Sequence, residues 1–170
     1  MFFAGHGLAS ADGRSLYRLP YDGAVSLLED TSLLRSELFD VISKAKPRSA
    51  TLFMDTCYSG LSRGEEMLLA SLRPVFIAAK QQDIPKGFTV LSAAGGKEFS
   101  GSLKEAQHGL FSYYLMKGME GGADANTDRK ITAGELHAYL GKNIRRQAIR
   151  LGREQTPELA GDADRVLVRW

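Results

Sequence analysis

The chain has 170 residues, 44% of them hydrophobic, and a formal net charge of +2 at pH 7, which fits one globular domain with a substantial core. The balanced charge, without a run of basic residues, argues against nucleic acid or an anionic membrane as the main partner. No stretch approaches the roughly 20 apolar residues of a membrane span, and one cysteine cannot form an intramolecular disulfide. We therefore expect a cytoplasmic protein.

The first residues, Met1-Phe-Phe-Ala-Gly-His-Gly7, predict a short apolar strand that runs into a tight turn. Glycines on both sides of His6 favour a turn with close backbone approach, so this histidine is a candidate functional residue and not a core residue. The other two histidines are weaker candidates. His108 precedes a predicted helix, and His137 lies on the face of another.

A second strand is predicted over residues 50–54, ending at Asp55. Before it, residues 15–19 predict a short strand or hairpin arm, and a helix capped by Thr31 or Ser32 is expected to run through Lys44. A strand, helix and strand of this length are typical of a right-handed crossover between parallel strands. The two strands should therefore be neighbours in a parallel sheet.

Cys57 follows the second strand directly and precedes the turn residues Ser59 and Gly60. A side chain in this position lies at the carboxyl end of a strand, where open α/β sheets form their ligand crevices. If His6 ends a neighbouring strand, its imidazole can take the thiol proton and later protonate a leaving amine. Cys57 and His6 are thus a candidate catalytic dyad, although an isolated cysteine is more commonly a small buried hydrophobic residue.

The remaining segments alternate between helix and strand patterns, which is typical of a three-layer α/β domain with a parallel or mixed sheet. The expected elements are a helix over residues 65–72, a strand over 88–94, helices over 109–119 and 133–151, and a final strand over 165–169.

Two motifs resemble the catalytic motifs of the caspase-like cysteine peptidases, in particular the metacaspases and bacterial caspase homologues. They are Phe3-Ala-Gly-His-Gly7 and Asp55-Thr-Cys-Tyr-Ser-Gly60, and similarity extends to residues 108–115 and to Gln155-Thr-Pro157. The spacing of about 50 residues between histidine and cysteine is that of caspases. The resemblance implies a single caspase-like domain, an α/β/α sandwich with a mostly parallel sheet.

Proteins of this family place a strand, a helix and another strand before the histidine strand, whereas this sequence begins within that strand. We therefore expect a domain that is incomplete at its N-terminus, with an apolar edge strand completed by an upstream segment or a second chain. The alternative to an enzyme is a non-catalytic caspase-like interaction module, or a remnant that needs another chain to complete its sheet.

The resemblance implies a cysteine-type endopeptidase in which Cys57 attacks the peptide carbonyl and His6 acts as base and acid. Gly7 and the backbone of Cys57 are the expected oxyanion donors. This chemistry requires no cofactor.

Asp55 precedes Cys57 by two residues, so both side chains fall on one face of the strand. In the metacaspase-like branch the matching acid selects arginine or lysine before the scissile bond, so we expect a protein or peptide substrate with a basic residue there. The structural alternative is an acid that caps the following turn. Ser92 and Glu98 are further candidates for the substrate pocket.

Residues 124–135 match the EF-hand calcium loop, in which oxygen ligands suit a hard cation. The candidate ligands are Asp124, Asn126, Asp128, Lys130 at the position of the backbone carbonyl, Thr132 and Glu135. Arg129 stands where the loop wants glycine, a mismatch of about 1 kcal/mol. Calcium is therefore a possible regulatory or structural ligand, and the alternative is an acidic turn that caps the next helix.

Overall fold

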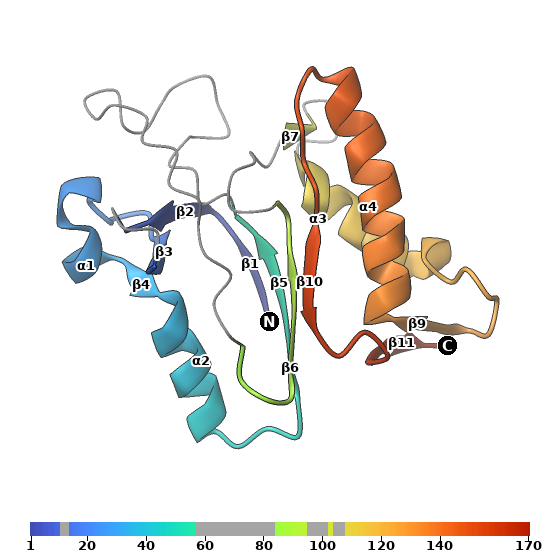
Figure 1. Ribbon diagram of the computed structural model, residues 1–170, viewed down its shortest axis with the longest axis horizontal. Helices are drawn as coiled ribbons and strands as arrows, with labels where there is room; N and C mark the ends of the chain where they lie inside the picture. Colours follow the sequence, from blue (N-terminus) through green and yellow to red (C-terminus); the bar gives the residue numbers. More distant parts are fainter. Residues whose placement is uncertain (11–13, 57–83, 95–101, 104–107) are drawn as a thin grey trace.

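The computed structural model describes residues 1–10, 14–56, 84–94, 102–103 and 108–170 (Figure 1). In these parts of the chain, no helix combines the length and apolar character needed to cross a lipid bilayer. The helix expected over residues 65–72 lies outside the described residues.

A four-stranded sheet forms the centre of the protein, in the order β1 (Phe2–Ala4), β5 (Ala50–Asp55), β6 (Phe88–Ser92) and β10 (Glu158–Gly161). β1, β5 and β6 are parallel, whereas β10 runs antiparallel to β6. β5 and β6 consist mainly of apolar residues because helices cover both faces of the sheet. The expected mostly parallel sheet is thus confirmed, with one antiparallel strand at its edge.

One face of the sheet packs on α2 (Arg35–Lys44), which joins β4 to β5 within the crossover from β1. Phe39 of this helix meets Phe88 of the sheet edge to face, with ring centroids 5.4 Å apart. Leu52, Met54 and Val90 complete this part of the core and are at most 1% exposed. Leu38 and Ile42 of α2 pack against the same cluster, so Phe39, Leu38 and Ile42 form the face of the helix that covers the sheet.

The opposite face packs on α3 (Leu110–Lys117) and α4 (Ala133–Arg150), so the sheet lies between two helical layers (Figure 1). This second part of the core is fully or nearly fully buried. Its members are Leu91, Ala93, Leu110, Phe111, Leu115, Ala123, Ile131, Ala133, Leu136, Leu140, Ile144 and Ala148. The three-layer α/β architecture expected from the sequence is confirmed.

Three small sheets surround this centre. The first joins β2 (His6–Ala9), β3 (Leu16–Leu19) and β4 (Leu33–Leu34). The others pair β7 (Ser102–Leu103) with β8 (His108–Gly109) and β9 (Lys130–Thr132) with β11 (Val166–Arg169). The short helical elements are η1 (Val25–Leu27), α1 (Leu28–Thr31) and η3 (Gly118–Gly122).

The start of the crossover helix was predicted wrongly. Thr31 is the last residue of α1, and its hydroxyl donates to the carbonyl oxygens of Ala24 and Leu27 while it accepts the N–H of Ala24. α2 begins only at Arg35, after β4. Thr31 therefore closes a turn upstream, since its hydroxyl finds local backbone partners that a cap would not use.

The predicted final strand is confirmed as β11, which pairs with β9 and lies outside the central sheet. The fourth strand of the central sheet is β10, which no pattern indicated because Glu158–Gly161 is short and lacks β-branched residues.

Candidate functional site

The carboxyl ends of β1 and β5 lie side by side. Ala4 pairs with Asp55, and the N–H of Gly5 donates to the carbonyl oxygen of Asp55 at 3.3 Å. The chain then turns into β2, whose first residue is His6. His6 is partly buried and pairs with Leu19 of β3. The structure therefore places the histidine two residues after the end of β1, the strand adjacent to β5.

Asp55, the last residue of β5, is completely buried. Its Oδ2 accepts hydrogen bonds from the backbone N–H of Ser112, at 3.3 Å, and from the Ser112 hydroxyl. Ser112 lies in the first turn of α3, where free N–H groups and the helix dipole favour a negative charge. Among the described residues, the carboxylate is thus held by the first turn of a distant helix.

The carboxyl end of β6 completes the same rim. Ser92 is partly buried and lies opposite Met54, and the N–H of Ala93 donates to the carbonyl oxygen of Met54 at 2.8 Å. The side-chain amide of Gln155 donates to the carbonyl oxygen of Ala93 at 2.9 Å. Gln155 is only 1% exposed, and its buried hydrogen bond connects the segment before β10 to the carboxyl end of β6.

Gly7 is buried in β2 and pairs with Arg18 of β3. Arg18 is 1% exposed, and its guanidinium lies 5.4 Å from the ring centroid of Phe3 and donates to the sulfur of Met54 at 3.4 Å. A buried cation of this kind needs such partners to offset its lost hydration. The sheet of β2 and β3 is therefore packed on β1 and β5 directly below the rim.

Two predicted site residues, Cys57 and Glu98, lie outside the described residues, so the dyad, the backbone of Cys57 as oxyanion donor and the second pocket acid stay predictions. The weaker histidines are placed elsewhere. His108 belongs to β8, and the Nε2 of His137 lies 3.0 Å from the carbonyl oxygen of Pro157.

The loop before α4 shares one backbone feature with an EF-hand loop, the conformation of its sixth residue. Arg129 has φ of 61°, the left-handed conformation for which glycine is preferred. The side-chain oxygens of the loop accept hydrogen bonds from backbone N–H groups: Asp124 from Asp128 and Arg129, Asn126 from Asp128, and Asp128 from Lys130.

The last two candidate calcium ligands form the N-terminal cap of α4. Thr132 accepts the N–H of Glu135, and Glu135 accepts the N–H and hydroxyl of Thr132. This capping box satisfies helix amides that would otherwise lack partners. Within the described residues, no three acidic, histidine or cysteine side chains are grouped to hold a metal ion. The backbone at Arg129 thus fits the motif, and calcium binding by this loop stays a prediction.

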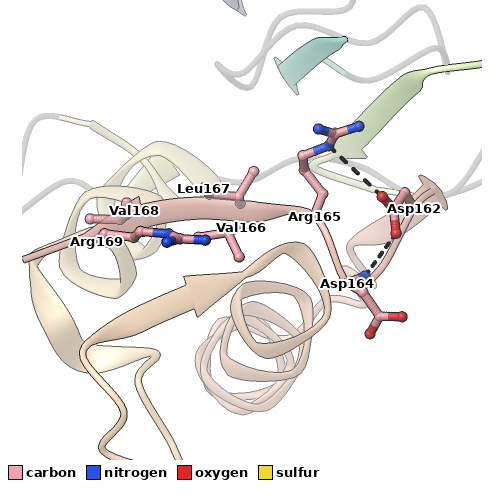
Figure 2. Close-up of a pocket in the computed structure, with 7 residues that line it drawn as sticks. All are labelled: Asp162, Asp164, Arg165, Val166, Leu167, Val168 and Arg169. Atoms are coloured by element: carbon pink, nitrogen blue, oxygen red, sulfur yellow. Dashed lines mark hydrogen bonds and ion pairs between the residues drawn. The ribbon is translucent and has the colours of Figure 1, made fainter. Parts of the chain in front are cut away.

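A separate surface hollow lies along β11, lined by Asp162, Asp164 and the strand residues up to Arg169 (Figure 2). Asp162 accepts the N–H of Asp164 at 3.0 Å and pairs with Arg165 at 3.8 Å. In Figure 1, β11 lies beside β9 on the right of the view, apart from the upper ends of β1 and β5. This hollow is therefore not part of the strand-end rim.

Comparison with known proteins supports the fold. No protein-family model and no curated protein matches the sequence. Among solved structures, the chain is similar to a protein from Geobacter sulfurreducens (18% identity, TM-score 0.56), with 96% of this chain and 66% of that one covered. It is also similar to caspase-1 from Spodoptera frugiperda (16% identity, TM-score 0.55), with 98% and 62% covered.

These similarities show a caspase-like fold, and at such identities they show the fold alone. The chain spans just under two thirds of the length of each of these structures. Sequence reasoning found His6, Gly7, Asp55 and Ser92 at the rim but missed Ser112. Residues 108–115 were part of the family resemblance, but the resemblance assigned no role to Ser112.

Proposed function

We propose that this protein is a cysteine endopeptidase with Cys57 as nucleophile and His6 as general base. The observation that carries this proposal is the register of β1 and β5. Phe2 pairs with Phe53, Phe3 with Met54, and Ala4 with Asp55. The histidine follows the end of β1 by two residues, and Cys57 follows the end of β5 by two residues, so both motifs continue from adjacent strand ends.

A general base must come within reach of a hydrogen bond, or of one bridging water, from the thiol, and two adjacent strand ends allow this. The imidazole would remove the thiol proton, and the thiolate would attack the peptide carbonyl. His6 would then protonate the leaving amine, leaving a thioester that water hydrolyses to the acid. Gly7, the residue after His6 in β2, is the proposed oxyanion donor.

Asp55 is the proposed specificity residue for arginine or lysine before the scissile bond. Because its carboxylate is completely buried, a substrate cation would have to enter a deep pocket to reach it. Charge pairs in such surroundings are stronger than pairs at the surface. Ser92 and Glu98 are proposed as further contacts of this pocket, with Ser92 supported by its place at the carboxyl end of β6.

The test is turnover of a fluorogenic peptide panel that differs only in the residue before the scissile bond. We expect arginine- and lysine-ending peptides to be cleaved and aspartate-ending peptides to be spared. Cys57→Ala and His6→Ala should each lower kcat by at least roughly a hundredfold. His137→Ala, which removes a histidine outside the rim, serves as the control. Faster cleavage of the aspartate-ending peptide would contradict the proposed specificity.

One observation favours a second candidate function, an interaction module completed by another polypeptide. β1 lies at the edge of the central sheet, and the side chains of Met1 and Phe2 are each 51% exposed. An apolar edge strand offers backbone groups and side chains to a further strand. In this alternative, the added strand would come from a second chain or from an upstream segment.

A further inference from the structure

We infer that Ser112 is a positioning residue that fixes the Asp55 carboxylate for a cationic substrate side chain, an inference that rests on the proposed function. Ser112 supplies two donors to one oxygen, Oδ2 of Asp55: its backbone N–H, at 3.3 Å, and its hydroxyl. Two donors on one oxygen restrict both the position and the rotation of the carboxylate. The acid and the serine come from elements 57 residues apart.

The environment of Asp55 makes these donors necessary. The residue is completely buried, as is Thr56 beside it, and a buried carboxylate is costly unless it is hydrogen-bonded. The N-terminus of α3 adds a partial positive charge beside the carboxylate. Ser112 therefore supplies two of the donors that a carboxylate at this buried position requires.

The helix that carries Ser112 is a rigid support. Leu110 and Phe111 are completely buried, and Leu115 is 5% exposed, so α3 is fixed against the central sheet on both sides of the serine. Side chains that act on a substrate are held accurately when their own partners lie on well-packed elements. The packing of α3 thus sets the position of the carboxylate relative to β5.

Helix formation itself does not require the hydroxyl. Alanine is a better helix former than serine at an ordinary helical position. Ser112→Ala would preserve the helix and the backbone N–H bond to Asp55, and it would remove only the hydroxyl bond. Ser112→Thr would retain a hydroxyl at the same point. These two variants separate the hydroxyl from everything else that α3 contributes.

The experiment measures binding without turnover, in Cys57→Ala protein, by calorimetry. The probes are acetyl-Ala-Ala-Ala-Arg amide and the peptide with citrulline, a neutral isostere, in place of arginine. The preference for arginine over citrulline reports the carboxylate. We expect Ser112→Ala to lower this preference about tenfold, as the loss of one hydrogen bond to a charged group implies, and Ser112→Thr to restore most of it. Met116→Ala, an exposed position on α3, should leave it unchanged.

Two results would overturn the inference, and they are distinguishable. If Ser112→Ala weakens the binding of both peptides equally, or of neither, the serine does not position the acid. The proposed peptidase function is not affected by that result. If the parent protein shows no arginine preference, the proposed basic specificity fails together with the inference. In that case the fluorogenic panel still decides whether the wild-type chain is a peptidase of other specificity.

Discussion

The backbone N–H of Gly5 donates a hydrogen bond to the carbonyl oxygen of Asp55 at 3.3 Å. This bond extends the pairing of β1 and β5 to the residue before His6. The two strands therefore remain adjacent up to Gly5 and Asp55. The proposed dyad depends on this adjacency more than on any other feature of the fold.

β10 and β6 approach so closely that a methyl group added at Gly161 should lower the stability of the protein. Gly161 has φ of 104°, and a Cβ there would overlap the carbonyl oxygen of Phe88. We expect Gly161→Ala to lower the free energy of unfolding by about 2 kcal/mol or more, measured by urea denaturation.

The matched control for that substitution is Gly141→Ala in α4. A Cβ at Gly141 meets nothing within 4 Å. The free energy of unfolding of this variant should therefore rise by about 1 kcal/mol, because alanine is a better helix former than glycine. Equal stabilities of the two variants would show that the described contact between the strands is wrong.

The exposed edge of β1 predicts that a lysine at Phe2 reduces association. Lysine on an edge strand opposes pairing with a further strand. If a second copy of this chain adds to β1, sedimentation should show self-association of the wild-type protein that Phe2→Lys suppresses. Val41→Lys, which changes an apolar side chain that is 63% exposed on α2, is the control and should have no effect. A wild-type protein that stays monomeric at every concentration would exclude such self-pairing.

Calcium binding by the loop before α4 is a further prediction. If the loop binds calcium, titration calorimetry should show heat at millimolar concentrations or below, and Asp124→Asn should abolish it because the first ligand loses its charge. Asp40→Asn, at an exposed position on α2, is the control. The absence of heat from the wild-type protein would leave the capping box as the function of Thr132 and Glu135.

The parts of the fold that depend on local pattern could be predicted from the sequence. The apolar runs that end at Ala4 and Asp55 gave the correct neighbouring strands, because short buried strands in a crossover unit have few arrangements. The α2 boundary could not be predicted in the same way. The hydroxyl of Thr31 bonds to Ala24, an interaction that no helix-start pattern contains.

Long-range partners were beyond the reach of sequence patterns. Asp55 and Ser112 are separated by 57 residues, and neither residue type specifies the other. The same holds for Gln155 and the carbonyl oxygen of Ala93, which are 62 residues apart. The position of Asp55 on its strand was predictable from alternation, whereas its burial against α3 depends on tertiary packing.

The most direct test of the proposed dyad is labelling by an arginyl peptide with an electrophilic ketone, followed by intact mass spectrometry. We predict one added label, located at Cys57 by peptide mapping, and a rate of labelling that falls at least roughly tenfold in His6→Ala. His137→Ala should react at the wild-type rate. Labelling of Cys57 at the same rate with and without His6, or no labelling of Cys57 at all, would contradict the account.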